Sequence, residues 1–292
     1  MKKKIFALAL ACAVSLSLLA GCGADNQPSG GNSQAPANSD AGTEASAPAA
    51  NVTIRVGATP APHAEILEQV VDVLAEQGIT LEIETINDYN TPNDGVEDGS
   101  LDANYFQHIT YMNGYNADNG THLVSVGEIH YEPLGLYAGK TDSIDALPDG
   151  AQIAVPNDTT NEARALLLLE QEGLLTLAEG AGINATVLDI VDNPKNLEFV
   201  ELEAAQIPTR LADVDMAVIN GNYAMGAGMS IADALAIEAN DGTAATAYAN
   251  VVAVKEGNED NEAILALVAA LQSEEIRAWM EEEYQGAVVP LS

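Results

Sequence analysis

The 292-residue sequence is poor in cysteine and in basic residues, and each shortage excludes a class of protein. Its only cysteines, Cys12 and Cys22, lie near the N-terminus, so the rest of the chain must be stabilised by a hydrophobic core without disulfides. Ten Lys and Arg residues face 44 Asp and Glu residues, and the formal net charge is −34. Such a chain repels nucleic-acid phosphates and anionic lipid headgroups, so we expect no nucleic-acid partner.

Motifs that perform catalysis or bind metals are also missing. The sequence has no Gly-x-Ser-x-Gly elbow, no His-Glu-x-x-His pair, no Walker loop and no dinucleotide fingerprint. The four histidines, His63, His108, His122 and His130, have none of the short spacings of known zinc sites. We therefore expect no enzyme activity, no cofactor and no metal, with convergence of the four histidines on zinc as the alternative.

The first 21 residues have the three parts of a secretion signal. Lys2–Lys4 form a positive head, and the apolar run 5–20 is shorter than the roughly 20 residues of a membrane span. The run ends in Leu19-Ala20-Gly21-Cys22, which is typical of a bacterial lipobox. We expect cleavage to leave Cys22 as the lipid-carrying N-terminus of an extracytoplasmic, membrane-anchored protein with a net charge of −37. The alternative is an ordinary cleavable signal with an incidental cysteine.

Residues 22–50 are predicted to form the lipidated cysteine and a disordered tether. Residues 23–50 are mostly Ala, Ser, Gly, Pro, Asn and Gln, without Val, Ile, Leu or an aromatic residue. Such a segment buries too little apolar surface to offset the entropy cost of folding.

The remaining sequence predicts an α/β fold, because strand patterns and helix patterns alternate along it. In the first predicted helix, Ile66, Val70, Val73 and Leu74 share one face. We expect strands at 52–57, 81–86, 152–156, 185–191, 197–200, 216–219 and 248–254, and helices at 63–76, 161–172 and, as one or two segments, 262–283.

The order of these segments predicts two α/β lobes. The first lobe would hold residues 52–140 and 249–292, and the second would hold residues 141–248. Chain segments near Tyr137–Lys140 and Ala249–Lys255 would cross between them. A cleft between two lobes is a preferred ligand site.

The chain from about Val56 to Pro290 resembles the methionine-binding lipoproteins of the NlpA type, which are the extracytoplasmic receptors of a methionine ABC importer. A series of segments in order is more specific than any single motif. The matching segments are Val56–Pro60, Pro62–Glu65, Asn87–Tyr89, Pro92-Asn93, Asp102–Asn104, Phe106–His108, Pro156–Asp158, Asn161, Arg164–Leu166, Asn193–Leu197, Ala217–Asn220 and Tyr223-Ala224.

The resemblance implies a two-lobed periplasmic-binding-protein-like (Venus-flytrap) fold that closes on methionine. It implies three partners, namely L-methionine or a related amino acid, a permease with its cytoplasmic ATPase, and the membrane through the lipid; we expect a monomer. It also implies a set of ligand-binding residues. These are Tyr89, Phe106, His108, Tyr111, Asn161, Arg164 and Asn220, with Gln107 and Asn104 in support.

These residue types suit methionine chemically. Arg164 offers a guanidinium fork for the carboxylate, Asn220 offers an amide for the amino-acid head group, and aromatic rings attract the thioether sulfur. The alternatives are an arginine paired with a protein acid, a turn-forming asparagine before Gly221, and an aromatic cluster that belongs to the core.

Two other functions stay open. The same fold could bind another apolar amino acid, a dipeptide or a metal complex, or the chain could be a surface lipoprotein without a transport role. Ile109–Tyr111 and Gly221-Asn222 depart from the family pattern, which leaves the preference for L- or D-methionine open.

Overall fold

The computed structural model describes residues 51–239 and 246–291 of the chain. The predicted secretion signal, the predicted lipidation site Cys22 and the predicted tether lie outside the described residues. Within the described ranges, no helix combines the length and the apolar character that crossing a bilayer requires.

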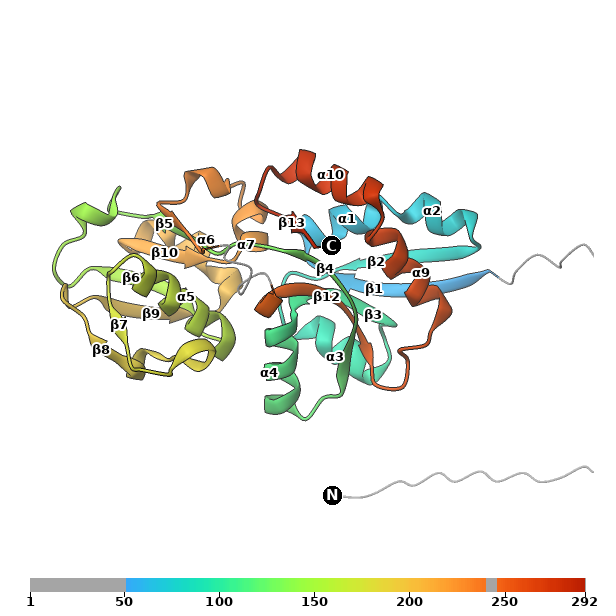
Figure 1. Ribbon diagram of the computed structural model, residues 1–292, viewed down its shortest axis with the longest axis horizontal. Helices are drawn as coiled ribbons and strands as arrows, with labels where there is room; N and C mark the ends of the chain where they lie inside the picture. Colours follow the sequence, from blue (N-terminus) through green and yellow to red (C-terminus); the bar gives the residue numbers. More distant parts are fainter. Residues whose placement is uncertain (1–50, 240–245, 292) are drawn as a thin grey trace, which may run out of the picture. The chain divides into compact units, whose positions relative to one another are not determined.

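Six strands form the sheet of the first lobe, in the order β13-β4-β12-β3-β1-β2 (Figure 1). β1 pairs in parallel with β2 and β3, whereas β12 is antiparallel to β3 and β4, and β13 is antiparallel to β4. The strands are β1 (Val52–Ala58), β2 (Ile79–Thr85), β3 (Ala103–His108), β4 (Leu123–Tyr131), β12 (Ala249–Lys255) and β13 (Val289–Pro290).

Helices cover both faces of this sheet. Successive residues of a strand point to opposite faces, and both faces of this sheet carry apolar side chains that the helices bury. Ile54 and Val252 pack on one side with α1, α2, α9 and α10, and Phe106 and Val251 pack on the other with α3 and α4 (Figure 1). The helices are α1 (Glu65–Glu68), α2 (Val71–Glu76), α3 (Thr91–Asp98), α4 (Ile109–Asn119), α9 (Glu262–Leu271) and α10 (Glu274–Tyr284).

Five strands form the sheet of the second lobe, in the order β11-β5-β10-β6-β9 (Figure 1). β6 pairs in parallel with β9 and β10, and β5 is antiparallel to β10 and β11. The strands are β5 (Gly135–Ala138), β6 (Gln152–Pro156), β9 (Glu198–Leu202), β10 (Met216–Ile219) and β11 (Ala236–Ile237). A separate antiparallel pair holds β7 (Thr176–Leu177) and β8 (Ile190–Asp192).

The second sheet is also covered on both faces. Ile153 and Val218 pack with the apolar side of α5 (Thr159–Gln171), and Ala154 and Ile219 pack with α6 (Ile207–Arg210) and α7 (Gly221–Gly226). The carboxyl ends of β6 and β10 lead directly to α5 and α7, which places the start of each helix at the same edge of the sheet.

The two crossings between the lobes differ from the expected ones. β5 pairs with β10 in the second sheet, so Tyr137 lies inside that sheet and the first crossing is the short segment Glu132–Leu134. The expected second crossing, Ala249–Lys255, is β12, which lies between β4 and β3 in the first sheet. Both predictions of crossing position were wrong, because a buried apolar strand within a sheet has the same composition as a buried connection.

Several predicted elements agree with the structure, and two do not. The strands at 152–156 and 216–219 and the helix after Asp158 are confirmed. The expected helix 63–76 is instead a π-helical turn, η1 (Pro60–Ala64), followed by α1 and α2, and Val73 is exposed. The expected strand 185–191 is wrong over most of its length, because a 3-10 turn at Val187–Asp189 precedes β8.

Candidate ligand-binding site

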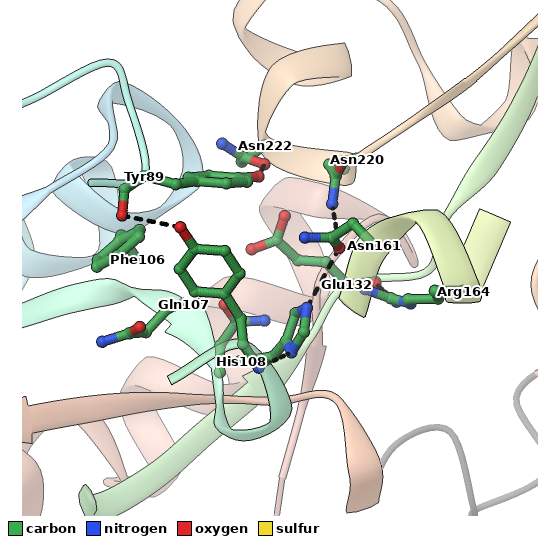
Figure 2. A pocket seen from close by; sticks show the side chains of 12 residues that line it. Tyr89, Phe106, Gln107, His108, Glu132, Asn161, Arg164, Asn220 and Asn222 are labelled. Atoms are coloured by element: carbon green, nitrogen blue, oxygen red, sulfur yellow. Dashed lines mark hydrogen bonds between the residues drawn. The ribbon is translucent and has the colours of Figure 1, made fainter. Parts of the chain in front are cut away.

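A cavity lies among residues that come from both lobes and from the first crossing between them (Figure 2). Its lining residues are Tyr89, Phe106, Gln107, His108, Tyr111, Glu132, Asn161, Arg164, Asn220, Gly221, Asn222 and Asn250.

The structure brings all seven predicted ligand-binding residues into the lining of this cavity. Gln107, which we expected to support the site, also lines it. Asn104 is buried outside the lining, where its Nδ2 donates to Asn93 Oδ1 and its Oδ1 accepts from Gln107 Nε2. Asn104 thus holds Gln107 from behind.

The aromatic wall comes from the first lobe. β3 places Phe106 in the wall, the first turn of α4 adds Tyr111, and the segment between β2 and α3 adds Tyr89. The ring centroid of Tyr89 lies 5.7 Å from that of Phe106 and 5.5 Å from that of Tyr111. These separations are those of favourable tilted and edge-on aromatic pairs, so the three rings support one another as one apolar surface.

His108 connects this wall to the second lobe. Its Nδ1 accepts a hydrogen bond from the backbone N–H of Tyr111 and so caps α4. Burial, with a smaller effect of the nearby Arg164 charge, lowers the pKa of His108 to about 3, so the ring is neutral near pH 7. The single ring proton is therefore on Nε2, which donates to Asn161 Oδ1 at 3.2 Å.

Three asparagines form the polar side of the cavity. Asn161 lies in the first turn of α5, where its Nδ2 donates to Asp158 and its Oδ1 accepts from Asn220 Nδ2 at 2.8 Å. Asn222 Oδ1 accepts from the Tyr89 hydroxyl at 2.6 Å, a hydrogen bond between the lobes. Asn220 Oδ1 and Asn222 Nδ2 are fully buried and have no hydrogen-bond partner among the described residues. These two atoms give the cavity a free acceptor and a free donor.

Arg164 enters the cavity wall from α5 with part of its guanidinium already in use. Nε and Nη2 donate to the two carboxylate oxygens of Glu238, and Nη2 also donates to the Glu132 carbonyl oxygen. The guanidinium carbon lies 4.3 Å from the ring centroid of Tyr248. Burial acts to lower the pKa of Arg164, but the Glu238 carboxylate outweighs it and holds that pKa above the ordinary value. Nη1 takes part in neither the Glu238 nor the Glu132 contact.

The expected alternative for Arg164, pairing with a protein acid, is what the structure contains. Because the Glu238 pair neutralises its charge, Arg164 adds directed N–H groups to the cavity rather than a net positive charge. The two hydrogen bonds from Nε and Nη2 to the Glu238 carboxylate also fix the orientation of the guanidinium plane.

The four histidines do not converge on one point. His108 lies in the cavity wall, and His122 is exposed beside Glu97. His63 and His130 face the same carboxylate oxygen of Glu132, and these three are the described residues whose side chains could together hold a metal ion.

The comparison with known proteins places the chain in a family. The sequence profile of the NlpA lipoproteins matches residues 54–292. The chain belongs to the NlpA lipoprotein family. This NlpA-family chain is 41% identical over 240 residues to the D-methionine-binding lipoprotein MetQ of Salmonella typhimurium, covering 81% of this chain and 87% of the relative.

Two solved structures resemble this NlpA-family chain closely. A lipoprotein from Ruminococcus gnavus has a TM-score of 0.81 at 55% identity, and the match covers 82% of this chain and 99% of the other. A nutrient-binding protein from Burkholderia cenocepacia, whose structure has methionine bound, has a TM-score of 0.76 at 41% identity, with 82% and 100% covered. The two-lobed fold is thus that of periplasmic-type binding proteins.

Sequence reasoning missed four lining residues of this NlpA-family chain. Glu132 lies on the crossing segment, Asn250 on β12, and Gly221 and Asn222 in the first turn of α7. Gly221 leaves room for the Glu132 side chain, because a Cβ there would lie 2.9 Å from Glu132 Oε2 and 3.1 Å from Glu132 Cβ. Only Asn222 carried a usable signal, since it follows Asn220 at the end of a buried strand; Glu132 and Asn250 meet the cavity through tertiary contacts alone.

Proposed function

We propose that this NlpA-family protein is an extracytoplasmic solute receptor that binds methionine in the cavity and delivers it to an ABC importer. The observation that carries the proposal is the pair of buried, unpartnered amide atoms, Asn220 Oδ1 and Asn222 Nδ2, beside an aromatic wall. A relative named for D-methionine binding and a structural neighbour with methionine bound support it.

The head group of an amino acid fits the polar side. Its ammonium group would donate to Asn220 Oδ1, and its carboxylate would accept from Asn222 Nδ2 and from Arg164 Nη1. Buried polar atoms without partners cost free energy, and a zwitterion supplies the missing partner of each. The zwitterion also adds no net charge to the cavity, where Arg164 is paired with Glu238 and Glu132 forms part of the wall.

The thioether side chain of methionine fits the aromatic side. Tyr89, Phe106 and Tyr111 present ring faces and edges, which attract a polarizable sulfur by about 0.3–1.5 kcal/mol. An unbranched side chain would lie along these rings, and a β-branched or charged side chain would not.

Binding would be coupled to lobe closure, without covalent chemistry. Tyr89–Asn222 and His108–Asn161 are hydrogen bonds between the lobes, and their residues also line the cavity. A ligand that contacts both sides would favour the closed arrangement because it binds that arrangement better. Attachment through lipid on Cys22 would keep the receptor near its permease and raise the effective concentration.

The test is calorimetry on protein that has been unfolded, stripped of ligand and refolded. We expect L-methionine to bind at micromolar concentration or better, and titration of D-methionine will establish the stereochemical preference. Leucine, alanine and methionine-containing dipeptides serve as competitors, and mass spectrometry of the co-purifying ligand gives an independent reading. Absence of methionine binding, with tight binding of a competitor, would replace methionine with that solute.

A further inference from the structure

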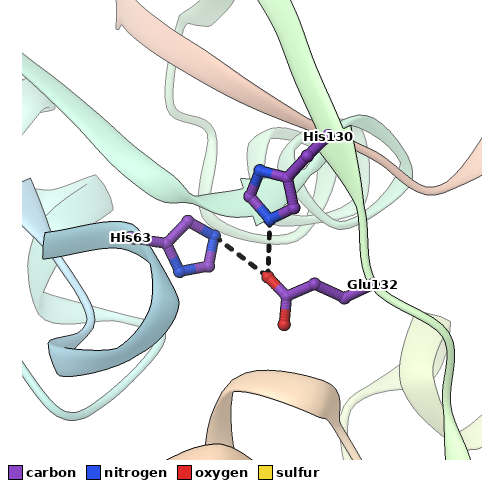
Figure 3. Close-up of side chains that lie close together, drawn as sticks. All are labelled: His63, His130 and Glu132. Carbon is purple, nitrogen blue, oxygen red and sulfur yellow. Dashed lines mark hydrogen bonds and ion pairs between the residues drawn. The ribbon is translucent and has the colours of Figure 1, made fainter. Parts of the chain in front are cut away.

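A buried cluster of two histidines and one carboxylate lies beside the cavity and is not used by the proposed methionine site. His63 comes from η1, His130 from β4, and Glu132 from the crossing segment (Figure 3). His63 Nε2 lies 3.3 Å and His130 Nε2 lies 2.8 Å from the same oxygen, Glu132 Oε1. Both histidine side chains are almost completely buried.

The far nitrogen of each ring is held by a hydroxyl group. His63 Nδ1 lies 2.7 Å from Thr59 Oγ1, and His130 Nδ1 lies 2.5 Å from the Tyr105 hydroxyl. Partners on the second ring nitrogen fix both the orientation and the tautomer of histidines that bind metals. The cluster therefore has three converging donor atoms, and the hydroxyl groups of Thr59 and Tyr105 hold its two histidine rings in place.

We infer that His63, His130 and Glu132 form a binding site for a divalent transition-metal ion of the zinc type. Zinc bonds of about 2.0–2.1 Å in tetrahedral geometry place donor atoms about 3.4 Å apart. The three donor atoms all lie within 4.8 Å of one another, with two separations of 2.8 and 3.3 Å, so shifts of about 1 Å or less complete the site.

Binding of the metal ion by the two histidines releases no proton from either ring. Each imidazole keeps its one proton, which moves from Nε2 to Nδ1, where Thr59 Oγ1 and the Tyr105 oxygen accept it. A fourth donor is Asn250 Oδ1, 3.1 Å from His63 Nε2. Two imidazoles with oxygen donors favour zinc, copper or nickel over calcium and magnesium, which prefer oxygen ligands only.

The experiment uses full-length protein freed of metal and of methionine. Zn²⁺ is titrated in competition with a chromophoric chelator, which keeps the many acidic surface groups from contributing, and Co²⁺ absorption reports nitrogen ligands directly. We expect one Zn²⁺ per chain. Glu132→Gln and His130→Phe should bind roughly 100-fold more weakly, and Tyr105→Phe about 10- to 100-fold more weakly. His122→Ala, which changes an exposed histidine, is the matched control and should bind Zn²⁺ as the wild type does.

Two results would overturn the metal site. One is failure of wild-type protein to compete with the chelator, and the other is equal affinity of Glu132→Gln and wild type. Melting temperatures of each variant confirm that the fold is retained, and Glu132→Gln keeps the size and an acceptor oxygen for the two histidines. Because Zn²⁺ binding is measured without methionine, its outcome is independent of the proposed function.

Discussion

The substitution Asn220→Ala tests whether the Asn220 side chain contacts the ligand or only stabilises the fold. In the structure Asn220 makes one side-chain hydrogen bond, from Nδ2 to Asn161, and its Oδ1 is buried without a partner among the described residues. It begins α7 without a capping bond from its side chain. Asn220→Ala therefore loses about 1 kcal/mol from the Asn161 bond, and removes an unsatisfied acceptor whose burial costs about 1–3 kcal/mol. The ligand-free variant should therefore be as stable as the wild type or up to about 2 kcal/mol more stable.

The methionine complex should respond very differently. A hydrogen bond between Asn220 Oδ1 and the ligand ammonium group is charge-assisted, and such bonds contribute about 1.5–3 kcal/mol. Since about 1.4 kcal/mol corresponds to a tenfold change in affinity, Asn220→Ala should bind methionine about 10- to 150-fold more weakly. A hundredfold loss also removes about 2.7 kcal/mol of ligand-induced stabilisation at saturating methionine.

The assay combines calorimetric titration with urea unfolding in the presence and absence of methionine. Asn116→Ala is the control, because Asn116 makes three hydrogen bonds to Thr121 and Leu123 and lies outside the cavity lining. That variant should lose stability and keep its affinity, the reverse of Asn220→Ala. Unchanged methionine affinity in Asn220→Ala, or a large loss of stability without ligand, would refute the reasoning.

Three further changes test the rest of the site. Tyr89→Phe keeps the ring and removes the bond to Asn222, so calorimetry should show affinity several-fold weaker, by about 1 kcal/mol, and unchanged affinity would mean that this bond does not report closure. Arg164→Lys keeps the charge but cannot serve Glu238 and the ligand together, so we expect a loss of at least tenfold in affinity together with lower stability; wild-type affinity would exclude the guanidinium contact. His108 has a folded-state pKa of about 3, well below the roughly 6.5 of the unfolded state, so the unfolded chain takes up the proton first and stability falls as pH drops below about 6.5. At pH 5 this loss is about 2 kcal/mol, and in urea titrations His108→Gln should show a pH dependence smaller by that amount; equal pH dependence of the two proteins would contradict the buried neutral ring.

The local order of apolar and polar residues was sufficient to predict part of the fold. The strands β6 and β10 are short runs of buried apolar residues bounded by turns, and α5 has a clear apolar face and Asp158 as its N-cap. β3 and β4 escaped prediction, because Asn104, Gln107 and His130 are polar although buried. These side chains are satisfied by partners distant in the sequence, such as Asn93 for Gln107 and Tyr105 for His130, and a local pattern contains no information on such pairs.

The site could be assembled from sequence only where a family resemblance supplied the positions. All seven residues chosen in that way line the cavity, and their role as ligand contacts stays a prediction. Glu132 and Asn250 could not have been chosen, because one lies on a three-residue crossing and the other on a strand that returns from the end of the chain. The bidentate partner of Arg164 was equally hidden, since any of 44 acidic residues could have filled that place.

The pairing of Arg164 with Glu238 has a consequence for the conditions under which the receptor works. The ligand is a zwitterion and Arg164 is already paired with Glu238, so binding adds no net charge to the cavity, whose wall also includes Glu132. Affinity should therefore be almost independent of ionic strength, although the chain as a whole is strongly acidic. A receptor outside the cell is exposed to whatever salt concentration surrounds it, and this arrangement would let it capture its solute equally well in dilute and in saline media.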